Sequence, residues 1–141
     1  MRTRTLLPVA LAVLVFGAGP HDARSQPPAT GAQVATVLAE ALPNVPGKKL
    51  TAVVVSYGPG GKSGPHRHAG SVFAYVLSGS IRSENSATGP ARVYRVGEGF
   101  FEPPGSEHLV SENASATEPA RLLAVLVVDA ADQQLVIPDP Q

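Results

Sequence analysis

The chain of 141 residues has the length of one ordinary domain, and its apolar fraction of 43% is sufficient to form a core. It carries 11 Lys and Arg against 11 Asp and Glu, so it lacks the basic surface with which general nucleic-acid-binding proteins neutralise phosphates. Cysteine is absent, which excludes disulfide scaffolds, thiolate metal sites and a cysteine nucleophile. Any chemistry must therefore use histidine, carboxylates, hydroxyl groups or a bound cofactor.

The first 25 residues have the pattern of a secretory signal peptide. Arg2 and Arg4 precede an uncharged, mostly apolar run at 6–19, and the small residues Ala23 and Ser25 favour cleavage after Ser25, with Ala18 or Gly19 as an earlier alternative. The competing interpretation is an uncleaved membrane anchor, but the run is shorter than the roughly 20 residues that span a bilayer. We expect a secreted or periplasmic protein without stable membrane insertion after cleavage.

The remaining sequence predicts a single β-domain. Residues 26–33 are expected to form a flexible lead-in, residues 34–130 the domain, and residues 131–141 a surface tail. Apolar, often β-branched runs separated by Gly- and Pro-containing turns predict strands at 50–57, 72–77, 81–84, 91–96, 99–102, 108–113 and 121–128. The segment 34–42 fits a strand or a helix. Short strands at these intervals are typical of an all-β sandwich or barrel.

Three histidines remain once residues 1–25 are removed: His66, His68 and His108. Residues two apart on a strand point to the same face, so the imidazoles of His66 and His68 can approach one ion. His108 begins another predicted strand and could supply a third imidazole. Neutral imidazole binds Zn, Fe, Cu or Ni without thiolates. The alternative is that all three are surface or hydrogen-bonding histidines without a metal.

Two stretches around these histidines resemble the two motifs of the cupin family. Gly60-(x)5-His66-Arg67-His68-(x)10-Gly79 is similar to the first motif, G(x)5HxH(x)3-4E(x)6G. Gly97-(x)5-Pro103-Pro104-Gly105-(x)2-His108 is similar to the second, G(x)5PxG(x)2H(x)3N. The resemblance implies a small jelly-roll β-barrel with a metal held inside by His66, His68 and His108, and it favours a strand at 34–42.

The sequence departs from the first motif at the position of its glutamate, which falls at Val72, or at Phe73 with the longer spacing. Neither side chain binds a metal. Three-His cupins are a known subclass that includes iron dioxygenases, so the resemblance implies a divalent ion, with Fe(II) favoured and Zn, Ni, Cu or Mn as alternatives. Three neutral ligands would leave the charge of the ion unneutralised, and we expect such a site to attract an anion.

Glu102 is the best candidate for a substitute carboxylate, because it directly precedes the Pro103-Pro104-Gly105 turn before His108. It could be a metal ligand, an acceptor for an imidazole N–H or a general base; the alternative is a solvated turn residue.

Strand alternation predicts the wall of a substrate pocket. Counting from His68 brings Val72, Ala74 and Val76 to the inner face, and Val110 should accompany His108. These small apolar side chains would admit a compact organic molecule and exclude water.

The favoured function is an exported metal-dependent enzyme, oxygenase-like, that acts on a small organic substrate through His66, His68 and His108. A non-redox isomerase or lyase of sugar acids is a second form of enzyme. A binding module without turnover and a structural cupin with an empty site are the non-catalytic alternatives. Exposed strand edges, together with the resemblance, favour a homodimer.

Overall fold

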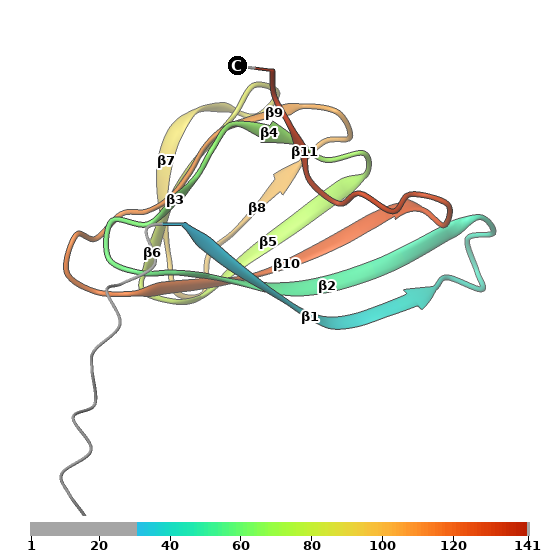
Figure 1. Ribbon diagram of the computed structural model, residues 1–141, viewed down its shortest axis with the longest axis horizontal. Coiled ribbons are helices and arrows are strands. Elements are labelled where there is room, and N and C mark those ends of the chain that lie inside the picture. Colours follow the sequence, from blue (N-terminus) through green and yellow to red (C-terminus); the bar gives the residue numbers. More distant parts are fainter. Residues whose placement is uncertain (1–30, 141) are drawn as a thin grey trace, which may run out of the picture.

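The computed structural model describes residues 31–140, which form two antiparallel sheets facing each other (Figure 1). The first sheet contains, in spatial order, β1 (Ala32–Ala41), β2 (Lys48–Tyr57), β10 (Ala120–Asp129), β5 (Ser71–Ser78) and β8 (Gly99–Glu102). The second contains β11 (Ile137–Pro138), β4 (His66–Arg67), β9 (Glu107–Asn113), β6 (Ser80–Asn85) and β7 (Gly89–Arg95), with β3 (Lys62–Ser63) also paired to β9. The predicted all-β, jelly-roll architecture is confirmed.

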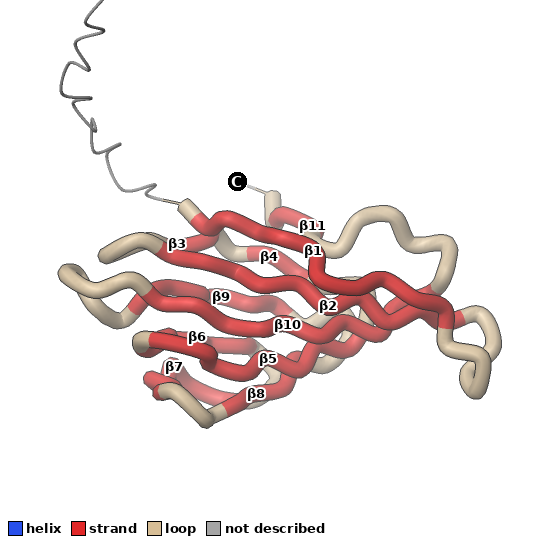
Figure 2. Tube along the Cα trace, turned by 90° about the horizontal axis from the view of Figure 1, so that it is seen from below, coloured by secondary structure: helices blue, strands red, loops and turns tan. Residues whose placement is uncertain are grey.

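The core lies between the two sheets, where alternate residues of the central strands meet. On β5, Val72, Ala74 and Val76 face inward and are at most 1% exposed, whereas Phe73 and Tyr75 face outward. Figure 2 shows the strands of the first sheet in front of those of the second. Inward residues of β10 pack against those of β5, because these strands are direct neighbours in the sheet. This alternation explains why the β5 and β10 sequences could be assigned as strands.

Residues 32–41 form an edge strand rather than a helix. β1 pairs with β2 from Ala32 opposite Tyr57 to Ala41 opposite Lys49, with an irregularity near Val37. It therefore starts within the segment expected to be a lead-in. The signal peptide predicted at residues 1–25 and the first residues of that expected lead-in lie outside the described residues. No helix in residues 31–140 is long and apolar enough to cross a membrane.

The C-terminal segment is more than a surface tail. Its short strand β11 pairs with β4, placing Ile137 opposite Arg67 and Pro138 opposite His66. Arg67 forms ion pairs with Asp139 and Glu107, and thus ties the segment to β4 and β9. Leu135 is partly buried against the core. The segment thereby lies beside β4, the strand that contains His66 (Figure 1).

Candidate metal centre

Strand pairing brings the three predicted ligands together. His66 on β4 and His108 on β9 are directly opposite one another in the second sheet, and His68 follows β4. The ring centroids of His66 lie 4.9 Å from those of both His68 and His108. One ligand atom from each histidine lies within 4.8 Å of the others. Residues 40 positions apart in the sequence therefore converge on one point, as a three-His metal site requires.

Hydrogen bonds fix which nitrogen of the His66 and His68 rings is available. Nδ1 of His66 lies 2.8 Å from the carbonyl oxygen of Gly64, and Nδ1 of His68 lies 2.6 Å from that of Leu135. Because a carbonyl oxygen only accepts, both Nδ1 atoms must carry the proton, which leaves each Nε2 with a free lone pair. In His108, Nε2 lies 2.9 Å from Ser83 Oγ, a hydroxyl that can donate or accept, and Nδ1 lies 3.1 Å from Glu102 Oε2.

A backbone contact joins the two motifs. The N–H of Gly105 donates to the carbonyl oxygen of His68 over 2.8 Å, so the Pro103-Pro104-Gly105 turn is attached directly to the HxH segment. Gly105 has a φ of 71°, in the left-handed region that glycine adopts without steric cost. This turn connects the end of β8, at Glu102, to the start of β9, and so determines where Glu102 and His108 lie relative to His68.

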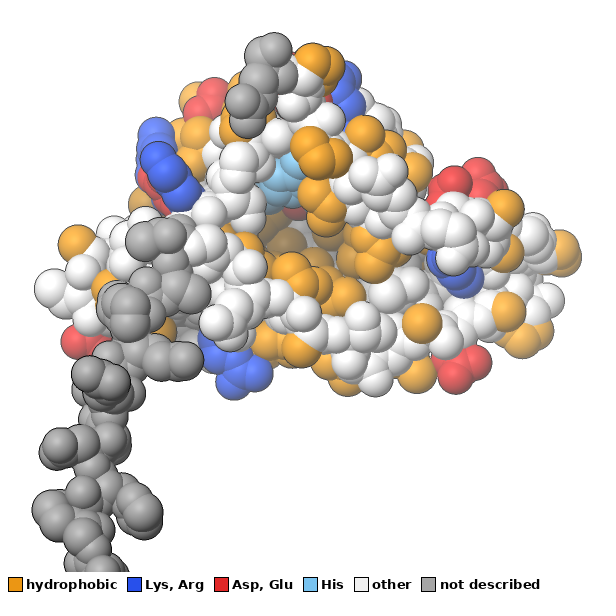
Figure 3. Space-filling view, viewed as in Figure 1, with side chains coloured by type: hydrophobic (Ala, Val, Ile, Leu, Met, Phe, Trp, Pro, Cys, Tyr) orange, Lys and Arg blue, Asp and Glu red, His pale blue; other side chains and the backbone are white. Residues whose placement is uncertain are grey.

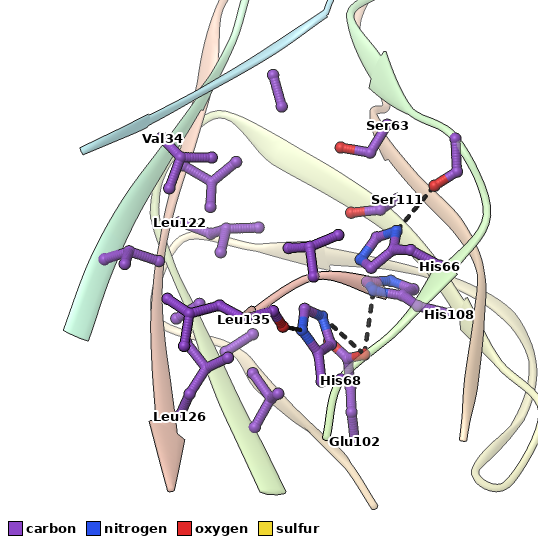
Figure 4. Close-up of a pocket in the computed structure, with 18 of the residues that line it drawn as sticks. Val34, Ser63, His66, His68, Glu102, His108, Ser111, Leu122, Leu126 and Leu135 are labelled. Carbon is purple, nitrogen blue, oxygen red and sulfur yellow. Dashed lines mark hydrogen bonds and ion pairs between the residues drawn. The ribbon is translucent and has the colours of Figure 1, made fainter. Parts of the chain in front are cut away.

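Glu102 is a buried residue beside the histidines and not a solvated turn residue. It is 3% exposed, and its Oε2 lies 3.1 Å from Nδ1 of His108 and 3.8 Å from Nε2 of His68 (Figure 4). It is not part of the set of mutually close ligand atoms, which comprises the three histidines. Its strand partner across the first sheet is Val72, the position at which the first motif has its glutamate.

Burial and the neighbouring imidazoles act in opposite directions on the pKa of Glu102. Desolvation raises the pKa, but a hydrogen bond and electrostatic attraction from His108, with smaller contributions from His68 and His66, hold it below the ordinary value. The carboxyl group is thus ionised at neutral pH. For His66, desolvation by burial is the largest effect and lowers the pKa, helped by repulsion from His108 and His68. His66 is therefore neutral at pH 7, the form that binds a metal.

The arrangement fits a bound cation. Glu102 Oε2 and His108 Nδ1 are both buried and lie 3.1 Å apart, and among the described residues neither has a polar partner besides the other. A divalent ion among the free imidazole nitrogens would satisfy Nδ1 of His108 and balance the charge of Glu102. Three protein nitrogens leave coordination positions open, as in catalytic rather than structural sites.

The histidines line one wall of a cavity of about 260 Å³ between the two sheets. In Figure 3 a hollow between the sheets has hydrophobic side chains on its floor and histidine on its wall. Figure 4 shows Val34, Leu122 and Leu126 on the side opposite His66, His108 and Glu102. Further apolar side chains of the lining are Val53, Val55, Phe100, Ala124 and Leu135.

Two of the four expected pocket residues line this cavity, and two do not. Val72 and Ala74 line it together with the histidines. Val76 faces inward as expected but belongs to the core cluster that includes Ile81 and Ala120 and does not line the cavity. Val110 does not line it, because β9 contains an extra residue at Leu109 relative to β6: His108 pairs with Asn85 and Val110 with Glu84. The bulge shifts the alternation, so Ser111 is the next inward residue after His108.

Sequence reasoning missed the contributions of distant segments. Leu135 both lines the cavity and accepts the hydrogen bond from His68, but nothing local in the C-terminal sequence indicates this. Tyr57, Ser63 and Ser111 form a hydroxyl cluster at the cavity, with Tyr57 Oη 3.0 Å from Ser63 Oγ and 2.8 Å from Ser111 Oγ. The pairing of β3 with β9 creates that cluster, and such pairing cannot be read from spacing alone.

Residues 53–126 match the family described as "Cupin domain". The chain belongs to the cupin family. The imidazoles of His66, His68 and His108 lie close enough together in this cupin to fit a divalent metal site. No curated protein gives a significant match to the chain.

Several solved structures share the fold. A Klebsiella pneumoniae protein with a double-stranded β-helix domain is 20% identical, with a TM-score of 0.60 over 81% of this chain and 90% of that chain. A cupin domain from Bordetella pertussis Tohama I is 19% identical, with a TM-score of 0.53 over 69% and 93%. The DMSP lyase DddQ from Ruegeria pomeroyi DSS-3 is 20% identical, with a TM-score of 0.53 over 63% of this chain and 42% of that chain. This cupin therefore spans less than half the length of the lyase.

Proposed function

We propose that this cupin is a metal-dependent enzyme that acts on a small organic substrate, with the ion held by His66, His68 and His108. The observation that carries the proposal is the open side of the three-His cluster, which faces the apolar cavity. A structural metal site would be closed by four protein ligands and would need no cavity. A substrate in this cavity would lie in contact with the ion and away from bulk water.

Fe(II) is the ion that we propose, and oxygenase-like chemistry is the proposed activity. Bound iron would supply Lewis acidity and reactivity toward dioxygen at this point. The chain supports this chemistry with its own residues: Gly64 and Leu135 orient the rings of His66 and His68, and Ser83 orients that of His108. We propose that Glu102 accepts a proton from the substrate, since its carboxyl group is ionised and its Oε2 has no other partner.

We further propose that the protein is exported, with cleavage after Ser25, and that it forms a homodimer. The N-terminal sequence pattern supports export. The outer face of the first sheet supports association, because Phe73, Tyr75 and Phe101 are 48%, 38% and 49% exposed there. Fractionation of the producing cells followed by N-terminal sequencing tests export and the cleavage site. Light scattering, which measures the molar mass of the mature protein in solution, tests the homodimer.

Elemental analysis of protein purified without a histidine tag is the first test. We expect about one divalent ion per chain in the wild type, and loss of that ion in His66→Ala and His108→Ala. Leu109→Ala is the matched control, because the side chain of Leu109 is exposed although the residue is next to His108 in the sequence. This variant should retain the metal. A wild-type protein that binds no divalent ion would overturn the proposal.

Oxygen consumption by the iron-loaded protein is the second test, over a panel of diketones, flavonols and thiols. Turnover that follows the iron content would support an oxygenase. Turnover that is indifferent to oxygen would instead indicate an isomerase or lyase. Full metal occupancy with saturable ligand binding and no product would assign a binding module.

A further inference from the structure

Three hydroxyl groups lie together in the lining of the cavity, separate from the candidate metal centre. Tyr57 Oη is 3.0 Å from Ser63 Oγ and 2.8 Å from Ser111 Oγ, and all three residues line the cavity. Tyr57 and Ser111 are buried, with exposed fractions of 3% and 5%. Within residues 31–140, none of the three hydroxyl groups is hydrogen-bonded to a histidine or to Glu102. We call these three residues the hydroxyl cluster.

The hydroxyl cluster has one more hydrogen to donate than its internal contacts can use. Each hydroxyl group carries one hydrogen, so the cluster has three, whereas its two contacts use only two. Whichever way the groups are turned, one O–H therefore finds no acceptor among the described residues. That O–H belongs to Tyr57, Ser63 or Ser111, each of which lines the cavity. A ligand with an oxygen at this point can accept the remaining hydrogen bond.

The hydroxyl cluster lies beside the histidines on one wall of the cavity. Ser111 and His108 are successive inward residues of β9, because the bulge at Leu109 shifts the alternation. Their cross-strand partners are Ser63 and His66, and Figure 4 shows Ser63 and Ser111 beside His66. Successive inward residues of a strand are about 7 Å apart. One small molecule can therefore contact both an ion at the histidines and the hydroxyl cluster.

The charges at the cavity favour one negative charge on such a molecule. Imidazoles that bind a metal are neutral, so the two positive charges of a divalent ion would meet only the single negative charge of Glu102. One ligand carboxylate at the ion would balance the remaining charge. No lysine or arginine of residues 31–140 lines the cavity, so a second carboxylate at the hydroxyl cluster would be buried without a counter-charge. A neutral oxygen there needs only the hydrogen bond.

We propose that the hydroxyl cluster is a second binding site for the substrate, which is a small monocarboxylate with a neutral ketone or hydroxyl oxygen. The carboxylate binds the ion, and the neutral oxygen, about four carbon atoms farther along the molecule, accepts the hydrogen bond of the cluster. This deepens the proposed function and rests on it. The cavity of about 260 Å³ is just below the roughly 300–1,000 Å³ of pockets for drug-sized ligands, in agreement with a short carbon chain. Tyr57, Ser63 and Ser111 are thus specificity-determining residues.

Calorimetric titration of the zinc-loaded protein tests the second binding site. Zinc can hold the carboxylate without redox turnover. The matched probes are 5-oxohexanoate and 5-methylhexanoate, in which a methyl group replaces the ketone oxygen. We expect the wild type to bind 5-oxohexanoate about fivefold more tightly, the scale of one net hydrogen bond. Without a donor at this point, the apolar lining would favour the methyl analogue, so the order of the two affinities reports on the hydroxyl cluster.

The triple variant Tyr57→Phe, Ser63→Ala, Ser111→Ala removes the three hydroxyl groups and keeps the rest of each side chain. All three changes are needed, because any hydroxyl group left behind would still have a hydrogen to donate. We expect this variant to bind zinc like the wild type and to reverse the order of the two probes. Tyr94→Phe is the control: it removes a hydroxyl group outside the cavity lining and should keep the wild-type order.

A wild-type protein that binds 5-methylhexanoate as tightly as 5-oxohexanoate, or a triple variant that keeps the wild-type order, would overturn the inference. If the triple variant does not fold, a crystal structure of the zinc-loaded wild type with 5-oxohexanoate decides: the ketone oxygen must lie within hydrogen-bond distance of the cluster. Zinc content is measured first. A wild type without zinc refutes the proposed function, whereas full zinc with no preference for the ketone refutes only the second binding site.

Discussion

Val72 and Glu102 are cross-strand partners between β5 and β8, and both side chains face the interior. The first cupin motif has its glutamate at the position of Val72. This chain instead carries a carboxylate on the neighbouring strand, directly opposite that position. Side chains of paired residues are about 4.5–5.5 Å apart at Cβ, so the negative charge remains near the histidines although it enters from another segment.

Glu102→Gln should weaken metal binding, because the carboxylate balances the charge of the ion and contacts His108. We expect a loss of affinity of about 10–100-fold, the usual effect of removing a partner of a metal ligand. Titration with zinc against a chelator of known affinity measures it. Glu112→Gln should bind zinc like the wild type. The double variant Val72→Glu with Glu102→Val, which returns the carboxylate to the motif position, should recover most of the affinity; equal affinity in wild type and Glu102→Gln would contradict this role.

Acid should destabilise the metal-free protein through His66. Burial lowers the pKa of His66 from its ordinary value of 6.5, so this group contributes stability above pH 6.5 that is lost as the pH falls through the folded-state pKa. The melting temperature of the metal-free protein between pH 8 and pH 5 should therefore decline below about pH 6.5, and His66→Gln should flatten that decline. An identical slope in both proteins would mean that other groups are responsible.

Deletion of residues 134–141 should weaken metal binding, because it removes Leu135 and its hydrogen bond to His68. The expected loss is again about 10–100-fold. Asp139→Asn is the control: it alters the ion pair with Arg67 but keeps Leu135, and a partly exposed pair of this kind contributes little to stability. If Asp139→Asn and the deletion weaken zinc binding equally, the effect arises from the ion pair and not from Leu135.

Gly105→Ala should destabilise the fold by about 1–2 kcal/mol, the cost of a left-handed conformation for a residue with a Cβ atom. The φ of Gly105 is 71°, and a Cβ there would have no heavy atom within 4 Å, so backbone strain is isolated from crowding. Gly64→Ala is the matched control, since its Cβ would also meet open space and its φ is not positive. Urea unfolding of the metal-free variants measures the difference, and equal stabilities would contradict the strain argument.

The sequence was sufficient to predict the elements that depend on local pattern. Alternation placed Val72, Ala74 and Val76 on the inner face of β5, and the spacing of the two motifs indicated the histidine cluster. Alternation failed on β9, because the extra residue at Leu109 reverses the faces of Val110 and Ser111. A bulge of this kind depends on how β9 pairs with β6, which the β9 sequence does not reveal.

The depth of the cavity and the role of the C-terminal segment also depend on tertiary packing. Val76 faces inward yet does not line the cavity, and it belongs to the same core cluster as Ile81 and Ala120. Leu135 reaches His68 through the pairing of β11 with β4, across more than sixty residues of sequence. Spacing within a motif cannot predict such contacts.

The pairing of His66 with His108 has a consequence for how the chain folds. The two residues belong to β4 and β9, which are separated in sequence by β5, β6, β7 and β8, so the site requires two distant strands to pair. Such non-local pairing is typical of slow-folding β-proteins. An ion gripped by these imidazoles would close a loop of the chain and penalise its opening, as a disulfide does in proteins that contain cysteine. Metal binding would then stabilise the folded arrangement of the strands in a chain that has no cysteine to form a disulfide.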